Sequence, residues 1–328
     1  MIEKIEPIPK IPEALRLAAL QRKIIPFIGA GVSQLGGCLG WDEFANAALK
    51  FFVRKGKLSH AQLDQVLSLS SRVKLSVALE LAKLHDLNID FKELLKPSDK
   101  HKEAIGDGVY QNLSRLATMF VTTNYDDWLD RMAPAVFQPG ETFSPSRPPP
   151  TSRRRFCKRN EITVENLDVP NAVFHIHGSI HEQDSMVLTT VHYLERYSSH
   201  RIDGGMEENP FLTFLQTLFK LKNVLFIGYG LSELEVLEYV VQKGIQRQPH
   251  DHEEPQHYVL QGFFSHEIEL ARSLESYFRQ FGIGLIPFSR DGRDWDQLIE
   301  VIDHFARELP PGPVTALPKR REMEELLS

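Results

Sequence analysis

Short apolar runs alternate with helix-periodic segments along most of the chain. Residues 24–28 (IIPFI) form an uninterrupted apolar run that ends in a glycine, which is typical of a buried strand leading into a βα turn. The same reasoning predicts further strands at 118–123, 172–176, 186–189, 224–227, 257–260 and 283–288. Helices are predicted at 12–22, 211–221, 234–243, 267–281 and 295–307. This alternation predicts an α/β fold with a mostly parallel sheet and helices on both faces.

Two segments interrupt the alternation. Helical periodicity alone runs through residues 41–116, which we interpret as a helical inserted subdomain within a Rossmann-like domain that spans 12–310. Residues 138–160 contain five prolines and a cluster of arginines and lysines, so they are predicted to form a long loop, either a solvated connector or a lid. Residues 311–328 are expected to form a flexible tail.

Composition narrows the function classes. A net charge of -6 argues against a general nucleic-acid binder, and no apolar run approaches the roughly 20 residues that span a bilayer. Only Cys38 and Cys157 are present, too few for a disulfide framework or a four-cysteine zinc site. The N-terminus lacks the apolar core of a secretion signal, so we expect a cytoplasmic protein.

The turn after the first strand is the first candidate ligand site. Its residues are Gly29, Ala30, Gly31, Val32 and Ser33. Glycines allow the backbone to approach a pyrophosphate, the following helix N-terminus offers free N–H groups, and the Ser33 hydroxyl adds a donor. A tight βα turn also uses glycine with no ligand, so the turn alone leaves both interpretations open.

A second polar group follows the strand predicted at 118–123. Thr123, Asn124 and Asp126 lie where that strand ends, at the edge where open α/β sheets bind ligands. Asn and Asp are also preferred helix caps, because their side chains accept hydrogen bonds from free backbone N–H groups. Each residue is therefore a candidate either for ligand contact or for capping.

Histidines mark the end of the strand predicted at 172–176. Strand alternation puts His175 and His177 on one face, and Gly178 leaves space beside His177. A neutral imidazole is the usual proton acceptor near pH 7, although a histidine at a buried strand end can also be a core group. Zinc binding by His175, His177 and His181 is a further alternative, with no cysteine or HExxH arrangement to complete it.

A second glycine turn follows the strand predicted at 224–227. Gly228, Tyr229, Gly230 and Leu231 form this turn, and its glycines either admit the adenosine half of a dinucleotide or only close a βα loop. Ser289, at the end of the last predicted strand, is a candidate to flank the adenine.

Taken in order, these segments resemble the sirtuin-like superfamily. The matching segments are 29–33, 122–126, 177–178 and 227–231, and the resemblance is more narrowly to the bacterial sirtuin-like domains of anti-phage defence systems, over roughly residues 20–305. It implies a Rossmann-type NAD site with the first glycine turn at the pyrophosphate. Asn124, Asp126 and His177 would surround the nicotinamide ribose, and the second glycine turn would contact the adenosine.

The resemblance implies an NAD glycohydrolase that forms nicotinamide and ADP-ribose, with NAD as substrate. Asn124 would orient water or the ribose hydroxyls, His177 would accept a proton, and Asp126 would order the pocket and oppose positive charge on the sugar. Protein-deacylating sirtuins carry a four-cysteine zinc module that this chain cannot form, so no zinc is expected. An NAD-dependent deacylase and a non-enzymatic dinucleotide sensor or assembly scaffold are the alternatives.

The resemblance also implies control of the activity, because unregulated NAD cleavage is toxic. We expect an effector of an abortive-infection system that assembles as a homo-oligomer. A separate sensor chain, a hexameric helicase-type ATPase or a short Argonaute, would activate it, with no direct binding of nucleic acid or membrane.

Overall fold

A single parallel sheet forms the centre of the protein. The structure, a computed structural model, describes residues 2–97, 99–132, 153–197, 201–202, 205–206, 209–230 and 254–309. The sheet has the strand order β3-β4-β2-β1-β7-β8-β9, and every neighbouring pair is parallel. Its strands are β1 (Ile24–Ile28), β2 (Phe120–Thr122), β3 (Arg154–Phe156), β4 (Ala172–His175), β7 (Asn223–Ile227), β8 (His257–Phe263) and β9 (Ile283–Ser289). A separate antiparallel pair is formed by β5 (Arg201–Ile202) and β6 (Gly205–Met206).

The strand order reverses at β1, the first strand of the chain. β2 lies on one side of β1 and β7 on the other, with Ile28 level with Thr122 and with Ile227. The segments that follow these three strands therefore leave the sheet at the same height. A reversal of this kind opens a crevice at the carboxyl edge of the sheet, which is where open α/β sheets bind ligands.

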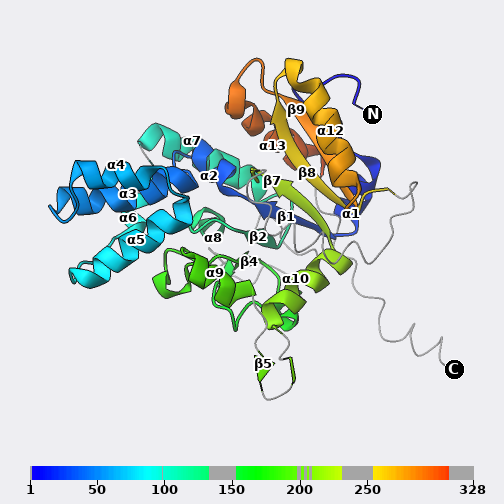
Figure 1. The fold of residues 1–328 in the computed structure, drawn as a ribbon. Coiled ribbons are helices and arrows are strands. Elements are labelled where there is room, and N and C mark those ends of the chain that lie inside the picture. Colours follow the sequence, from blue (N-terminus) through cyan, green and yellow to red (C-terminus); the bar gives the residue numbers. More distant parts are fainter. Residues whose placement is uncertain are drawn as a thin grey trace, which may run out of the picture.

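Both faces of the sheet are buried, as the apolar runs predict. In β1, Ile24 and Ile28 face one core, whereas Ile25 and Phe27 face the other. The first core is covered by α1 (Glu13–Leu20), α2 (Ala30–Leu35), α7 (Lys100–Leu113), α8 (Trp128–Arg131) and α13 (Gln297–Glu308). The second core is covered by α10 (Pro210–Leu221) and α12 (Ile268–Arg279). The predicted α/β class with helices on both faces is confirmed (Figure 1).

Four helices of the 41–116 range form a third core beside the sheet. They are α3 (Trp41–Arg54), α4 (His60–Leu67), α5 (Ser71–Leu84) and α6 (Phe91–Leu94), and Figure 1 shows them grouped to one side of the sheet. Lys74 of α5, only 2% exposed, forms an ion pair with Asp42 of α3 at 2.6 Å. The fifth helix of the range, α7, packs on the sheet instead, through Val109, Tyr110 and Leu113. We therefore apply the term helical layer to α3–α6 alone.

The interpretation of residues 138–160 as a loop is wrong for residues 154–156. Residues 154–156 form β3, the edge strand beside β4. Arg153, expected in a solvated segment, is 4% exposed and donates hydrogen bonds to the carbonyls of Thr118 (2.9 Å) and Ser114 (3.3 Å). Its guanidinium also stacks on Phe120. Arg153 thus binds carbonyls of the segment between α7 and β2, a role that composition does not distinguish from solubility. Residues 138–152 lie outside the described residues.

Two strand predictions also need correction. Residues 186–189 form no strand; their apolar character comes from packing of Met186 and Leu188 into the core of the helical layer. β4 ends at His175, one residue earlier than predicted. The helix predicted at 234–243 and the tail at 311–328 lie outside the described residues. Within the described part of the chain, no helix is both long and apolar enough to cross a membrane.

α9 (Thr190–Tyr197) completes the set of helices around the site. It contacts α5 of the helical layer and α10 of the sheet's second face. Short 3-10 helices connect the remaining elements, namely η1 (Val164–Asn166), η2 (Gln183–Ser185), η3 (Ser265–Glu267) and η4 (Asp294–Asp296).

Candidate functional site

The two glycine turns pack directly against each other at the crevice. The Gly29 N–H donates to the Ile227 carbonyl and the Gly31 N–H to the Gly228 carbonyl, both at 2.9 Å. A Cβ on Gly29 would lie 2.5 Å from the Gly228 oxygen, and Gly228 has a φ of +64°. The contact between the turns thus requires these glycines whether or not a phosphate binds. Ala30 and Gly31 remain partly exposed at the start of α2.

Asn124 reaches from the end of β2 to the first glycine turn. Its side-chain Nδ2 donates to Ser33 Oγ at 2.7 Å and to the Gly29 carbonyl at 3.0 Å. Its backbone N–H donates to Thr122 Oγ1 at 3.0 Å, and that hydroxyl donates to the Ile28 carbonyl. The side-chain Oδ1 is buried and has no hydrogen-bond partner among the described residues. A buried amide oxygen without a partner is costly, so it is a candidate acceptor for a ligand group.

Ser33 connects Asn124 with Asp126 and Tyr110. Its hydroxyl donates to Asp126 Oδ2 at 2.6 Å and lies 2.9 Å from the Tyr110 hydroxyl. The single Ser33 proton goes to the carboxylate, so the Tyr110 hydroxyl is the donor in the second bond. Asp126 Oδ1 also accepts from the Trp128 N–H at 3.3 Å, which is the helix-capping role considered from sequence. The structure therefore combines capping with a polar network.

Burial dominates the ionisation of this network. Desolvation raises the pKa of Asp126, with the Ser33 hydrogen bond opposing the shift. Desolvation, reinforced by the Asp126 charge, also raises the pKa of Tyr110 well above its ordinary value. Tyr110 therefore stays a neutral donor, and Asp126 holds its negative charge less firmly than an exposed aspartate.

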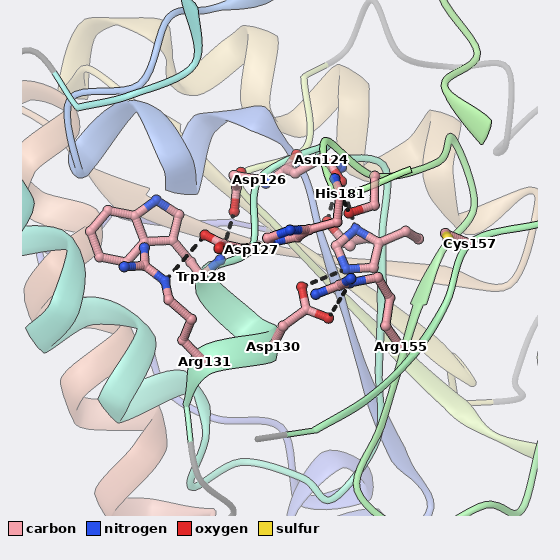
Figure 2. Close-up of polar contacts among 12 residues, drawn as sticks. Asn124, Asp126, Asp127, Trp128, Asp130, Arg131, Arg155, Cys157 and His181 are labelled. Carbon is pink, nitrogen blue, oxygen red and sulfur yellow. Dashed lines mark hydrogen bonds and ion pairs between the residues drawn. The ribbon is translucent and has the colours of Figure 1, made fainter. Parts of the chain in front are cut away.

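His175 and Asp130 form a buried pair directly behind Asn124. His175 Nε2 lies 2.9 Å from Asp130 Oδ2, and Nδ1 lies 3.0 Å from the Asn124 carbonyl oxygen. Arg155 of β3 donates its Nε–H to the other Asp130 oxygen at 2.9 Å, and Figure 2 shows Asp130 and Arg155 facing each other. Desolvation lowers the pKa of His175, but Asp130 outweighs it and the net shift is upward.

His177 lies outside the Asn124 network. Its Nε2 is 3.1 Å from the Tyr197 hydroxyl of α9, and its ring is partly buried. Because β4 ends at His175 and Gly178 turns the chain with a φ of +88°, strand alternation no longer directs His177. His175 and His177 therefore have different partners, Asp130 of α8 and Tyr197 of α9. Burial, then Arg196 and Arg72, lower the pKa of His177 to about 3.

The remaining predicted ligand residues have varied surroundings. Thr123 is buried and donates its N–H to the Ile28 carbonyl. Tyr229 packs its ring edge-on against Phe27 in the second core, whereas Gly230 is exposed. Ser289 lies on the edge strand β9, where its hydroxyl accepts from the Asp291 N–H.

A Cβ on Gly29 would lie 2.8 Å from the Tyr229 Cα, so Tyr229 belongs to the contact between the two turns. Leu231 lies outside the described residues. Val32 is buried in the first core. The structure therefore brings together Gly29, Ser33, Asn124 and Asp126 of the predicted site.

Two of the histidines of the zinc alternative have hydrogen-bond partners in the structure. Both His175 nitrogens are engaged as described, and His181 Nε2 pairs with Asp127 Oδ2 at 2.9 Å (Figure 2). Among the described residues, no group of three or more His, Cys, Asp or Glu is arranged to hold a metal ion. Cys38 and Cys157 are both buried.

Sequence reasoning missed several members of the site. Tyr110 was assigned to the inserted helices, and Asp130, Arg155 and Tyr197 were assigned no role. Asp130 follows Asp126 by one helical turn, a spacing that is compatible with a shared face. Arg155 had no distinguishing signal, because it stands in an arginine-rich stretch.

The reversed parallel sheet and its crevice define a Rossmann-like α/β domain. The family model described as a SIR2-like domain matches residues 118–286, just over half of the chain, and the chain belongs to this family. It therefore carries a sirtuin-related NAD-binding domain. No curated protein matches the chain. The matched residues include Asn124, Asp126 and His177, whereas the first glycine turn precedes them.

Proposed function

We propose that the protein is an NAD glycohydrolase that produces nicotinamide and ADP-ribose. The observation that carries this proposal is the buried Asn124 Oδ1, which has no partner among the described residues and belongs to a side chain bonded to the first glycine turn at the carboxyl edge of the sheet. A hydroxyl of ribose or a water molecule supplies the missing donor. NAD provides both the ribose and, through its pyrophosphate, an anion for the N-terminus of α2.

The reaction requires stabilisation of the sugar more than activation of the leaving group. Nicotinamide leaves the ribose C1′ as a neutral base and takes the bonding electron pair with it. The ribose passes through a transition state with oxocarbenium character, as in glycoside hydrolysis. Water then bonds to C1′ and releases one proton, so the site must orient the ribose and the water.

Asn124 is suited to orienting the ribose or the water, because its amide cannot flip without losing the hydrogen bond to the Gly29 carbonyl. Nδ2 faces the Gly29 carbonyl at 3.0 Å, and an oxygen in its place would be opposed to another acceptor. The second Nδ2 bond, to Ser33 Oγ at 2.7 Å, fixes the carboxamide plane. The Oδ1 direction is thus set before the substrate binds, which is preorganisation of an acceptor.

The protonation states of His177 and Asp126 limit which catalytic roles these residues can take. With a pKa lowered to about 3, His177 is neutral at pH 7 and accepts a hydrogen bond, but it is a weak base for complete proton removal. We assign it to accepting from a ribose hydroxyl or from the water as its proton becomes acidic. Asp126, engaged by Ser33 and by the Trp128 N–H, orders the network more than it opposes positive charge.

The test is to incubate the purified full-length chain with NAD and to identify the products by mass spectrometry. We expect nicotinamide and free ADP-ribose without any peptide. N124A and H177A should lower kcat by about 10²- to 10⁴-fold. The melting temperature should change little in H177A and fall in N124A, because the Gly29 carbonyl and Ser33 lose a buried donor. N112A in α7 and H181A beside the site are matched controls that should remain active.

Other outcomes identify the alternatives. Formation of O-acetyl-ADP-ribose with an acetylated peptide would show a deacylase. Binding of NAD without turnover, unaffected by H177A, would show a dinucleotide sensor or scaffold. Either result would overturn the glycohydrolase proposal.

We also propose, from the sequence resemblance, that this activity serves anti-phage abortive infection in the cytoplasm. The chain would act in a homo-oligomer and be released from an inactive state by a separate ATPase or Argonaute-type chain. Turnover assays should therefore include candidate partners. NAD loss in infected cells that carry the wild-type chain but not N124A would support this part of the proposal.

A further inference from the structure

The surroundings of His175 specify its protonation state. Its side chain is fully buried, and its two ring nitrogens face the Asn124 carbonyl oxygen at 3.0 Å and Asp130 Oδ2 at 2.9 Å. A carbonyl oxygen only accepts, so Nδ1 must carry a proton. If Asp130 is ionised, Nε2 must carry a proton too, and the ring is an imidazolium.

Asp130 has two cationic partners that keep it ionised. Arg155 Nε donates to Oδ1 at 2.9 Å, while the His175 ring faces Oδ2. Burial alone raises the pKa of this carboxyl, but His175 and Arg155 outweigh burial and lower it. Asp126, in the loop before α8, also favours a charged His175. The charged groups that act on His175 are thus Asp130 of α8, Asp126 of the loop after β2, and, through Asp130, Arg155 of β3.

The His175–Asp130 pair holds the main chain of Asn124 through the hydrogen bond from His175 to the Asn124 carbonyl. The Asn124 N–H donates to Thr122 Oγ1 and the Asn124 carbonyl accepts from His175, so both backbone polar groups of this residue are engaged. The direction of the Asn124 side chain depends on that backbone. An error of about 1 Å in the position of a catalytic group can cost on the order of 10²-fold in rate.

We propose that His175, as a buried imidazolium held by Asp130 and Arg155, is the positioning residue that fixes the Asn124 backbone for NAD cleavage. This inference rests on the proposed function for its consequence in turnover. Its structural content, a ring that anchors the residue-124 carbonyl, is independent of that function. No bond is made or broken by His175, and it does not contact the reacting atoms.

Three substitutions in the full-length chain separate the two hydrogen bonds of the ring. H175N keeps a donor near the Nδ1 position and therefore the bond to the Asn124 carbonyl. H175Q keeps a donor near the Nε2 position, towards Asp130, and loses the anchor. D130N removes the charge but leaves an oxygen to accept from Arg155 and an NH₂ to donate to a neutral His175, whose Nδ1–H still reaches Asn124.

We expect kcat to fall in the variants that lose the hydrogen bond to the Asn124 carbonyl and to be largely kept in those that retain it. H175Q should lower kcat by about 10²-fold with KM for NAD nearly unchanged, whereas H175N should lose at most about tenfold. Wild-type kcat should fall as the pH rises through the raised pKa of His175, because the neutral ring gives up one of its two bonds. D130N should stay active at pH 7 and lose this alkaline dependence.

Two measurements keep the inference testable without turnover. In protein with ¹⁵N-labelled histidine, both nitrogens of His175 should be protonated at pH 7 in the wild type, but only Nδ1 in D130N. Amide hydrogen exchange at residues 123–126 should accelerate in H175Q and remain slow in H175N.

A neutral His175 in the wild type, or H175Q with normal exchange and normal kcat, would overturn the inference. A wild type that shows the imidazolium and the exchange difference but stays inactive with every candidate partner would instead overturn the proposed function and leave the anchor standing.

Discussion

The contact between the two glycine turns makes a stability prediction with an internal control. Gly228 and Gly56 have nearly the same φ, +64° and +63°. A Cβ added to Gly228 would lie 2.6 Å from both the Val32 backbone nitrogen and Val32 Cγ2, whereas a Cβ on Gly56 would meet nothing within 4 Å. Alanine at both positions therefore carries the same conformational strain, and only G228A adds an overlap with backbone.

The expected magnitudes follow from these two terms. The left-handed conformation costs alanine about 1–2 kcal/mol, and about 0.4–1 kcal/mol is recovered from the less flexible unfolded chain. G56A should therefore lower the free energy of unfolding by about 1 kcal/mol or less. Overpacking adds about 1–3 kcal/mol, so G228A should cost about 2–4 kcal/mol.

Urea denaturation of the two variants and the wild type measures this difference directly. Because Ser33 follows Val32, G228A should also reduce NAD turnover, and G56A should not. Equal destabilisation by G228A and G56A would refute the close packing of the turns.

Three further predictions concern buried ionisable groups. R153M should lower the free energy of unfolding by about 2–4 kcal/mol in urea titrations, since two buried carbonyls lose their donor. Burial raises the pKa of Cys38 to about 12 and of Cys157 to about 11, so native protein at pH 8 should resist a disulfide reagent that labels both thiols in denaturant. The pKa of Asp130 is lowered and that of His175 raised, so their stabilisation should be greatest between pH about 4 and about 6.5. The difference in unfolding free energy between wild type and D130N should shrink as pH rises through the His175 pKa or falls through the Asp130 pKa; a flat difference would contradict the pairing.

Sequence reasoning identified the strand ends, because the carboxyl ends of parallel strands all lie at the same edge of the sheet. A buried run that stops at glycine or at Asn and Asp specifies a turn at one edge of the sheet, so Gly29 and Asn124 had to emerge together once β1 and β2 were neighbours. The reversal of strand order between β2 and β7 then added Gly228. The positions of Gly29, Asn124 and Gly228 depend on where the strands end, and the pattern of apolar residues indicates those ends.

Polar residues with long-range partners were not predictable in the same way. Arg153 and Arg155 stand in one basic stretch, yet Arg153 binds carbonyls between α7 and β2 and Arg155 binds Asp130. Their roles depend on β3 pairing with β4. A strand of three residues is too short to show an alternating pattern in the sequence. The direction of His177 was missed for a related reason, because alternation stops where β4 stops.

The loop after β2 joins the helical layer to the sheet. Tyr125, between Asn124 and Asp126, is the residue at which they meet. Asn124 and Asp126 reach the Ser33 side, whereas Tyr125 between them packs near Trp41 and Phe44 in the core of the helical layer. The Tyr125 hydroxyl also donates to the Val187 carbonyl at 2.8 Å.

The chain beyond His177 enters the same core through Ile180, Met186 and Leu188. Both candidate catalytic segments are therefore held by the sheet on one side and by the helical layer on the other. A force that shifts α3 against the sheet acts on Tyr125 first, and the backbone on either side of Tyr125 carries Asn124 and Asp126. The inserted helices are thus mechanically part of the site, although the hydrogen bonds of the Asn124 network come from the sheet edge, α2, α7 and α8.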